Sequence, residues 1–335
     1  MRRLLAVVSV LAALAAVAAV GLASGAQGTS KVDGVPAFGN VFVIIGENTD
    51  YSQVTKNNSP YLIETVKPES AWLTNYWATT HYSESNYVAM TSGQFTACEQ
   101  ADGSIASCHQ DVPNLFNQLD TTYGPGAWTS WMESMPSACD VSSFGSDAGL
   151  NKYRAKHNPA LIYDDVSGGF TNSGVQTPST ECLSQDIPAG TTGPNDMSAL
   201  NTALASGAVS RFNYIVPNEC EDAHDNCKPV GNPQLQFDGF LAREVPQILS
   251  SPAFGSNGVL IITYDEADTK SPNNAIKFGN GGNVVFAVVS PLANTGSYGS
   301  TWTHYSFLRT LEDGLGVGGY VGNAATATSI KNIWK

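Results

Sequence analysis

The sequence predicts an α/β fold, a three-layer sandwich in which helices cover both faces of a mostly parallel central sheet. Two observations lead to this prediction. Short apolar runs rich in β-branched residues alternate along the chain with segments of helical periodicity. The chain has 335 residues, of which 42% are hydrophobic and only 13% are charged, so it can bury a large core and its bulk is not expected to be disordered.

Four apolar runs are expected to be buried strands, and polar residues follow them closely. Glu47 and Asn48 follow the first run, Asn218 follows the second, and Asp265 and Glu266 follow the third. Functional sites in open α/β sheets lie at the carboxyl ends of the strands, which is where we expect the two acid-containing pairs. The runs are 41–45, 214–216, 259–262 and 284–289.

Segments of helical periodicity separate these runs, as expected for a parallel sheet. Residues 171–198, by contrast, are rich in Ser, Thr, Gly, Pro and Asn and predict a long surface loop. No sharp change in composition marks a second domain, so residues 27–335 are expected to form one domain. The expected helices lie within 61–66, 86–92, 115–119, 240–250 and 304–315.

The first residues have the pattern of an export signal. Arg2 and Arg3 precede a nearly unbroken apolar run, 4–23, and the small residues at 24–26 are of the kind that signal peptidase cleaves. We therefore expect residues 1–26 to be a signal peptide and the mature protein to be secreted or otherwise extracytoplasmic. Because the run is long enough to cross a bilayer, an uncleaved membrane anchor is the alternative. No other segment is expected to span a membrane.

Six cysteines follow the export signal, and an even number in an exported chain predicts disulfides. Six cysteines allow fifteen pairings. We favour the pairing of near neighbours, because each such disulfide closes a local loop without crossing the core. There is no C-x-x-C pair, so a cysteine metal site is the weaker interpretation. The favoured pairs are Cys98 with Cys108, Cys139 with Cys182, and Cys220 with Cys227.

The chain is acidic, with 16 lysines and arginines against 29 aspartates and glutamates and a net charge of −13. This charge repels phosphate backbones and anionic lipid surfaces, so nucleic acid is not expected as a partner. The sequence contains no G-x-S-x-G, H-E-x-x-H or G-x-x-x-x-G-K-[ST] motif, which argues against the lipase, zincin and P-loop classes.

The two acid-containing pairs can supply oxygen ligands for a divalent cation. Glu47-Asn48 and Asp265-Glu266 each follow a predicted strand, and hard divalent cations prefer such carboxylate and amide oxygens. Either pair alone could instead be a solvated loop or a helix cap. The presence of two such pairs favours a metal site.

Ser83 lies near the start of a predicted helix, where backbone amides and the helix dipole stabilise an anion. The serine would act as a nucleophile if a metal or a base lowered the pKa of its hydroxyl group. Alternatively, Ser83 or Ser85 only caps the helix.

Four of the five histidines lie in polar clusters, and the fifth, His109, neighbours a cysteine and is interpreted as structural. Asp222, His224 and Asp225 lie within four positions, a close grouping for a chain with so few histidines. That grouping could also be a loop held by the flanking cysteines. The four clustered histidines are His81, His157, His224 and His304.

Six short motifs follow one another along the chain: VIIGEN at 43–48, HYSESNYVAMTSG at 81–93, YRAKHNP at 153–159, IVPN at 215–218 with DAHD at 222–225, TYDEAD at 263–268, and HYSFL at 304–308. Together they resemble the bacterial phosphoesterase family that includes acid phosphatases and phospholipases C. The likeness is greatest to the small secreted acid phosphatases of the phosphatidylinositol-3-phosphatase type, and it covers most of the chain after the export signal. It implies an alkaline-phosphatase-like fold.

The resemblance also assigns roles to residues. It implies that Ser83 attacks phosphorus and forms a phosphoserine, which water then hydrolyses. A divalent cation and nearby histidines would stabilise charge on the phosphate oxygens and the leaving group. One strongly bound cation is expected. If a second one binds, the resemblance implies Asp222, His224 and His304 as its ligands. The expected catalytic residues are Ser83, His81, His157, His224 and Asp225, and the expected ligands of the first cation are Glu47, Asn48, Ser83, Asp265 and Glu266.

The sequence departs from the family pattern at two places. Tyr82 and Ser85 stand where the family often has proline, which loosens the turn around Ser83. Thr49-Asp50 replaces an arginine-serine pair, which removes a cation that could bind phosphate. These departures affect the expected substrate preference but leave every expected metal ligand in place.

The resulting hypothesis is a secreted, metal-dependent acid phosphatase that hydrolyses phosphate monoesters. The expected substrate is a small molecule or a lipid headgroup, such as that of a phosphoinositide. The alternatives are a phospholipase C-type phosphodiesterase and a catalytically silent exported binding protein with the same fold.

Overall fold

The computed structural model describes residues 31–98, 101–268 and 281–335. The named strands of these ranges belong to one sheet. They are β1 (Val41–Gly46), β2 (Ala71–Trp77), β3 (Trp128–Met132), β4 (Asp186–Pro188), β5 (Phe212–Val216), β6 (Val259–Tyr264), β7 (Asn283–Val289), β8 (Gly296–Tyr298) and β9 (Trp302–Thr303).

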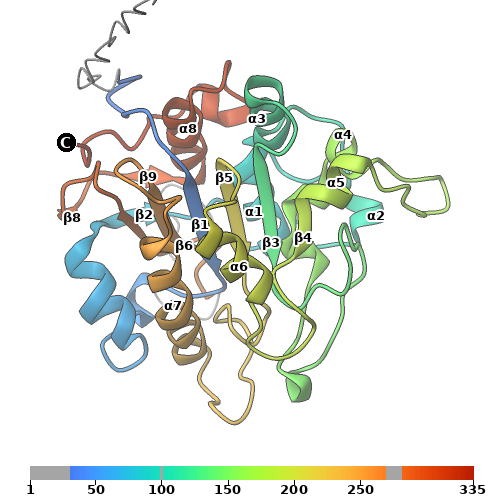
Figure 1. Ribbon diagram of the computed structural model, residues 1–335, viewed down its shortest axis with the longest axis horizontal. Coiled ribbons are helices and arrows are strands. Elements are labelled where there is room, and N and C mark those ends of the chain that lie inside the picture. Colours follow the sequence, from blue (N-terminus) through green and yellow to red (C-terminus); the bar gives the residue numbers. More distant parts are fainter. Residues whose placement is uncertain (1–30, 99–100, 269–280) are drawn as a thin grey trace, which may run out of the picture.

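Along the sheet the strands follow the order β4-β3-β5-β1-β6-β7-β2-β8, and β9 pairs with β2. All of these strands except β7 run in the same direction, because β7 is antiparallel to both of its neighbours and the other pairings are parallel. Strand β1 lies in the centre, between β5 and β6 (Figure 1), and all six of its residues are buried. The predicted mostly parallel sheet is therefore confirmed.

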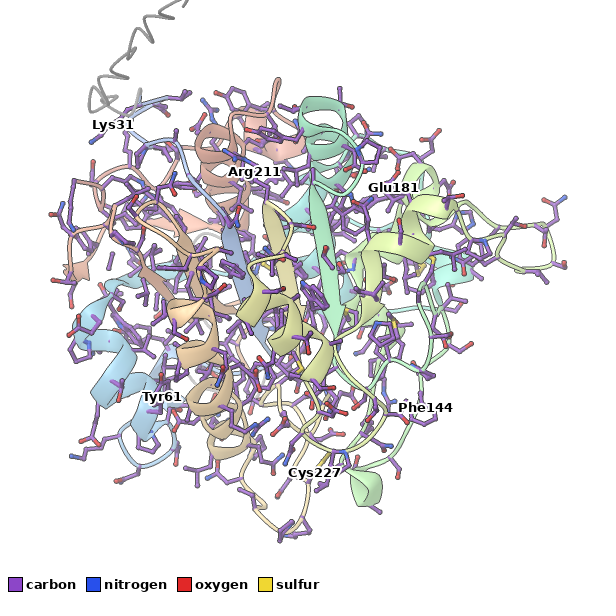
Figure 2. The ribbon with its side chains drawn as sticks, viewed as in Figure 1. Lys31, Tyr61, Phe144, Glu181, Arg211 and Cys227 are labelled. Atoms are coloured by element: carbon purple, nitrogen blue, oxygen red, sulfur yellow. A yellow bond between two sulfur atoms is a disulfide. The ribbon has the colours of Figure 1, made fainter. Side chains whose placement is uncertain are left out.

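Helices cover both faces of this sheet (Figure 1). They are α1 (Ser83–Ser92), α2 (Ile105–Cys108), α3 (Leu115–Tyr123), α4 (Asp164–Ser167), α5 (Thr180–Gln185), α6 (Ser198–Ser206), α7 (Pro233–Ser250) and α8 (His304–Leu315). Helices α6 and α7 contact each other on one face, and α1 contacts α8 and α3 on the other. Side chains fill the space between the sheet and the helices (Figure 2), and the buried apolar residues form one core.

Sequence signals mark the ends of two helices that cover the sheet. Asn232 precedes α7 and accepts a hydrogen bond from Leu235 N through its side chain, with Pro233 in the first turn, as is typical of a helix start. Helix α1 ends at Gly93, whose φ of 69° lies in the left-handed region that glycine adopts easily. The chain itself therefore specifies where α7 begins and where α1 ends.

The four predicted strands occur, as β1, β5, β6 and β7. The sequence pattern does not predict the other five, because these strands are short or mix aromatic and polar residues, as in AWLTNYW of β2 and WTSWM of β3. The prediction of one long loop over 171–198 is wrong in part, because α5 and β4 lie within it. The Ser179 side chain caps α5, and a disulfide holds that helix at Cys182. These contacts stabilise α5 although its sequence has no hydrophobic periodicity that would predict a helix.

The three disulfides join near neighbours, as predicted. They are Cys98–Cys108, Cys139–Cys182 and Cys220–Cys227. The predicted export signal, 1–26, lies outside the described residues. None of the helices in the described ranges is long and apolar enough to cross a membrane.

Candidate active site

The carboxyl ends of β1 and β6 lie side by side. The two strands pair in parallel up to their last residues, so Glu47 and Asp265 are the first residues beyond them. Asp265 N donates to Gly46 O at 2.9 Å, and Thr49 N donates to Glu266 O at 3.0 Å. The register of the sheet therefore brings the two acid-containing pairs together.

Asn48 turns the chain after β1. Its φ of 36° lies in the left-handed region, which asparagine tolerates better than most residues. Asn48 N donates to Asp265 Oδ1 at 3.2 Å, and Glu266 N donates to the same oxygen at 2.6 Å. One carboxylate oxygen of Asp265 thus fixes both loops.

Ser83 is the first residue of α1 and is buried, with an exposed fraction of 2%. Its Oγ donates to Glu47 Oε2 at 2.9 Å and lies 3.4 Å from Glu266 Oε1. The N-cap of α1 is Tyr82, so Ser83 is not the capping residue. The hydroxyl group is instead placed between a carboxylate beyond β1 and a carboxylate beyond β6.

Asn86, three residues into α1, holds the segment that precedes Ser83. Its Oδ1 accepts hydrogen bonds from Thr79 N and Thr80 N at 3.0 and 3.1 Å, and its Nδ2 donates to Thr80 O at 2.8 Å. Asn86 is fully buried and is not among the predicted site residues. Its position one turn beyond the candidate nucleophile is the signal that could have identified it.

His81 and His157 contact different carboxylates of the site. His81 Nδ1 lies 3.0 Å from Glu266 Oε2. His157 lies between two acids, with Nε2 3.4 Å from Glu47 Oε1 and Nδ1 3.7 Å from Asp222 Oδ2. Burial lowers the pKa of His157 well below its usual value, so this ring is neutral near neutral pH.

His224 lies close to His157, with 6.3 Å between the ring centroids. Its Nδ1 lies 2.7 Å from Asp225 Oδ1, and its backbone N donates to Asp222 Oδ1 at 2.8 Å. Burial opposes protonation of His224, but the hydrogen bond with Asp225 and nearby acids raise its pKa above the usual value. The site therefore combines a neutral imidazole with one that holds a proton more readily.

His304 has both ring nitrogens engaged. Its Nε2 lies 2.6 Å from Asp265 O, and its Nδ1 lies 2.8 Å from Tyr76 OH. Burial lowers the pKa of His304 to about 4. These contacts leave no ring nitrogen for a cation, which differs from the expectation that His304 binds a second one. The ring instead holds the backbone of Asp265.

Burial and mutual repulsion raise the pKa values of the carboxyl groups of this site. Burial is the main cause for Glu47, Asp222 and Asp265, whose pKa values all lie well above the usual range. Burial and the charge of Glu47 raise the pKa of Glu266 to about 9. Such a cluster holds protons or a cation to offset its negative charge.

Several buried polar atoms of the site have no hydrogen-bond partner among the described residues. Leaving a buried polar atom unsatisfied costs about 1–3 kcal/mol, and oxygens of this kind are the ligands that hard divalent cations prefer. The residues present therefore fit a divalent cation. The atoms are Glu47 Oε1, Asn48 Oδ1, Asp222 Oδ2, Asp265 Oδ2 and His157 Nε2.

Three groups of acidic, histidine and cysteine side chains in the described chain have ligand atoms close together, and one of them includes His224 and Asp225 of the site. Disulfide cysteines belong to two of these groups, and Lys152 occupies the third, with Nζ 3.2 Å from Glu219 Oε2. None of them is the set expected for the first cation. The groups, whose ligand atoms all lie within 4.8 Å of one another, are Cys139–Cys182–Asp186, Asp147–Cys220–Cys227 and Glu219–His224–Asp225.

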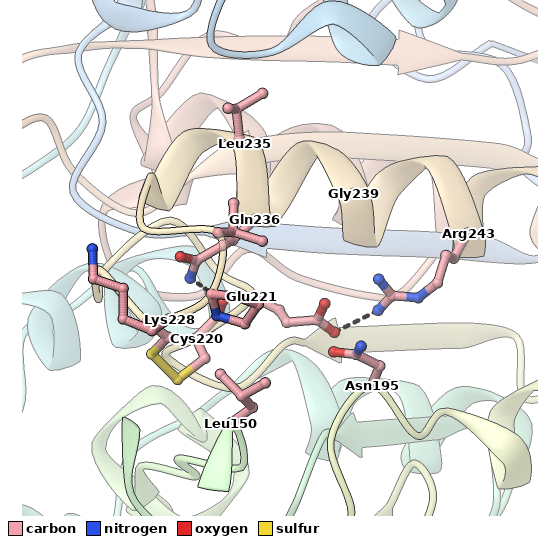
Figure 3. A pocket seen from close by; sticks show the side chains of 12 residues that line it. Leu150, Asn195, Cys220, Glu221, Lys228, Leu235, Gln236, Gly239 and Arg243 are labelled. Atoms are coloured by element: carbon pink, nitrogen blue, oxygen red, sulfur yellow. Dashed lines mark hydrogen bonds and ion pairs between the residues drawn. A yellow bond between two sulfur atoms is a disulfide. The ribbon is translucent and has the colours of Figure 1, made fainter. Parts of the chain in front are cut away.

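A cavity of about 340 Å³ lies beside the loop that carries Asp222 (Figure 3). Glu221 faces this cavity and pairs with Arg243 of α7, and the disulfide of Cys220 forms part of its wall. Asp222, the next residue, approaches His157 instead. Two successive residues of one loop therefore point to different places: Glu221 lines the cavity, and Asp222 belongs to the carboxylate cluster.

A model of the phosphoesterase family matches residues 55–318. The chain belongs to the phosphoesterase family. This membership confirms the resemblance of the sequence motifs and makes the chain a phosphoric ester hydrolase by class.

Curated relatives of this phosphoesterase include fungal and bacterial phosphatases. It is 28% identical to the phosphate-repressible acid phosphatase of Penicillium chrysogenum over 86% of this chain and 61% of the relative. It is 28% identical to the phosphatidylinositol-3-phosphatase of Mycobacterium tuberculosis over 88% of this chain and 84% of the relative. The chain thus spans about three fifths of the fungal enzyme and most of the mycobacterial one.

Solved structures show the same fold. A protein of the alkaline phosphatase superfamily from Vibrio parahaemolyticus matches 87% of this chain and 70% of its own with a TM-score of 0.58 and 11% identity. The lipoteichoic acid synthase LtaP of Listeria monocytogenes matches 90% of this chain and 80% of its own with a TM-score of 0.53 and 12% identity. The predicted alkaline-phosphatase-like fold is therefore confirmed.

The candidate site also includes aromatic residues that the sequence pattern does not distinguish from core residues. The Tyr87 ring stacks on His157, with 5.3 Å between the centroids, and Tyr76 OH contacts His304. Both tyrosines are fully buried. They look like ordinary core residues in the sequence, and only the packing of α1 and β2 around the site identifies their role in orienting the histidines.

Proposed function

We propose that this phosphoesterase is an exported, metal-dependent acid phosphatase that hydrolyses phosphate monoesters through a phosphoserine at Ser83. One observation carries the proposal. The buried Ser83 hydroxyl donates to Glu47 at 2.9 Å and lies 3.4 Å from Glu266. A serine hydroxyl with a proton acceptor at hand, beside carboxylates that can bind a cation, is suited to act as a nucleophile.

A divalent cation would be held by Glu47, Asn48, Asp265 and Glu266 together with Ser83. The oxygens without hydrogen-bond partners at three of these residues support this assignment. When bound, the cation would offset the charge of the carboxylates and lower the pKa of the serine hydroxyl.

In the first step, Ser83 Oγ forms a bond to phosphorus as the ester P–O bond breaks. Glu47 Oε2, 2.9 Å from Oγ, accepts the hydroxyl proton. His157, neutral and 3.4 Å from Glu47 Oε1, is placed to share that proton. His224, whose pKa is raised beside Asp225, donates a proton to the departing alcohol.

In the second step, water attacks the phosphorus of the phosphoserine and gives a proton to His224. The bond between phosphorus and Ser83 Oγ breaks, and Glu47 returns the proton to Oγ. Both residues thereby recover their starting protonation, and inorganic phosphate leaves. His81, which contacts Glu266, would orient that carboxylate and face the phosphate oxygens.

The proposed substrate class is the phosphate monoester of a small alcohol or of a lipid headgroup. Similarity to a phosphatidylinositol-3-phosphatase over most of both chains supports the inclusion of phosphoinositide headgroups. We further propose that residues 1–26 direct export, which agrees with the three disulfides of the described chain.

Ser83→Ala tests the proposal directly. We expect the purified protein to hydrolyse a chromogenic phosphate monoester in preference to its diester analogue, and a chelator to abolish the activity. Removal of the nucleophile should lower kcat by about 1,000-fold or more, while the melting temperature stays within a few degrees. Steady-state kinetics with and without chelator and added divalent cations measure all of these effects.

Ser92→Ala is the matched control, because Ser92 is a buried serine of the same helix that donates to Val88 O, away from the site. It should keep the wild-type rate. Preference for the diester would move the protein to the phospholipase C-type alternative. Folded protein that hydrolyses neither ester with added metals would favour the binding-protein alternative.

A further inference from the structure

Asp102 lies against the site described above, in the loop that the Cys98–Cys108 disulfide closes. Its Oδ1 accepts a hydrogen bond from Glu84 N at 3.0 Å, and its Oδ2 lies 2.8 Å from Lys156 Nζ. Glu84 directly follows Ser83, and Lys156 directly precedes His157. One carboxylate therefore bridges two hydrogen-bond donors, each next in the chain to a residue of the site.

Lys156 is within electrostatic reach of the acids around Ser83. Burial alone would lower the pKa of Lys156, but the charges of Glu47 and Asp102 raise it. In turn, Lys156 lowers the pKa values of Glu47 and Glu266. Both of these carboxylates contact the Ser83 hydroxyl.

Neighbouring cations of the same segment have other partners. Lys152 Nζ lies 3.2 Å and Arg154 Nε 3.0 Å from Glu219 Oε2. Lys156 instead pairs with Asp102, and both of these side chains are partly exposed, at 24% and 33%. Because an ion pair that water reaches is weak, another anion can replace Asp102 at Lys156.

A second cavity, of about 260 Å³, opens beside this bridge. Residues that line it include Lys156 and Arg154 as well as Gly103, Ile105 and Val141. An ester whose phosphate group reached Lys156 would therefore have space for its alcohol portion next to the loop that carries Asp102.

We propose that Lys156 and the backbone N–H of Glu84 bind the phosphate group of the substrate, and that Asp102 occupies these two donors in the free protein. This inference rests on the proposed function. A phosphate group offers more acceptor oxygens than a carboxylate and a larger negative charge, so it competes well for an ammonium and an amide together. Lys156 then supplies the cation that the Thr49-Asp50 departure removes from the family pattern.

Asp102→Asn and Lys156→Met test this assignment through the binding of inorganic phosphate, measured by titration calorimetry on the metal-loaded protein. Removing the competing charge should tighten phosphate binding about threefold, as expected for an exposed ion pair. Removing the ammonium should weaken it about tenfold or more, as expected for a charge-assisted hydrogen bond. The KM for a monoester should correspondingly fall in Asp102→Asn and rise in Lys156→Met, with kcat changing less in both variants.

The double variant shows whether Asp102 acts through Lys156. In the Lys156→Met background, Asp102→Asn should no longer change phosphate affinity. If Asp102→Asn proves unstable, Asp102→Ser keeps an acceptor for Glu84 N and should tighten binding in the same way. Asp111→Asn and Lys331→Met, which alter exposed residues elsewhere, should leave binding unchanged.

Unchanged or weaker phosphate binding by a stable Asp102 variant would overturn the inference, as would an effect of Asp102→Asn that persists without Lys156. The wild-type protein separates this failure from that of the proposed function. If it neither binds phosphate nor hydrolyses a monoester, both fail. If the wild-type protein binds phosphate and hydrolyses a monoester, but substitution of Asp102 and Lys156 leaves phosphate affinity unchanged, only the present inference fails.

Discussion

The pKa values of His224 and His157 shift in opposite directions although their ring centroids lie 6.3 Å apart. His157 is fully enclosed, and burial lowers its pKa. His224 is 28% exposed in its side chain and pairs with Asp225, which raises its pKa despite the burial. The environment of each residue, rather than its type, therefore makes His224 the ring that holds a proton more readily, which supports the proton-donating role proposed for it.

His224→Asn should slow the hydrolysis of different substrates to different extents, depending on their leaving groups. An alkyl alcohol needs a proton as it departs, so we expect kcat for glycerol phosphate to fall about 100-fold or more. A nitrophenolate departs without a proton, so kcat for nitrophenyl phosphate should fall much less. Parallel steady-state assays of the two substrates check this, and equal losses would contradict the role of His224 as the proton donor.

Strand β1 positions the site because it lies between β5 and β6 and ends directly before Glu47. Its last residue, Gly46, has no room for a side chain. A Cβ atom there would lie 2.8 Å from ring carbons of both Phe237 and Tyr264, closer than atoms can approach without a shift. The close packing of α7 and β6 against the end of β1 therefore requires glycine at this position.

Gly46→Ala should both destabilise the protein and displace Glu47. Overpacking of this kind costs about 1–3 kcal/mol, and a small shift of a catalytic group can cost about 100-fold in rate. Gly318→Ala is the matched control, since a Cβ there meets nothing within 4 Å. Urea denaturation and kcat measure the two effects, and a Gly46→Ala protein with wild-type values for both would contradict the packing argument.

At the scale of the whole molecule, buried acids make stability depend on pH. Asp186 of β4 is fully buried, and Asn158 Nδ2 donates to both of its carboxylate oxygens at 2.8 and 2.9 Å. Burial raises the pKa of Asp186 from 3.8 to about 7. Because the folded pKa is the higher one, its contribution to stability is complete below about pH 4 and is lost as the pH rises through about 7.

Asp186→Asn should therefore flatten the fall in melting temperature between about pH 5 and about pH 8 by roughly 5 °C relative to the wild type. Asp196→Asn offers a contrast, because hydrogen bonds with Thr191 and Ser198 lower the pKa of Asp196. Its stabilising contribution is present at both pH values, so that variant should melt lower by a similar amount at each. Calorimetric scans across pH decide the matter, and an unchanged slope for Asp186→Asn would refute the assignment.

Several features of this protein follow from the sequence alone, because they are local. Apolar β-branched runs predicted strands β1, β5, β6 and β7. Pairing each cysteine with a near neighbour in the sequence predicted the three disulfides. The order of the motifs identified the phosphoesterase family. The positions of Glu47 and Asp265 directly after strands also placed them at one edge of the sheet.

Tertiary structure alone decided the contacts between distant segments. His304 contacts the Asp265 backbone and Tyr76 rather than offering a nitrogen for a cation, and Asp102 reaches Lys156 across 54 positions of the chain. Such contacts depend on strand order and helix packing, which single-residue patterns do not encode. The charge of each buried group follows from the same packing, because its pKa depends on the neighbours that the fold places around it.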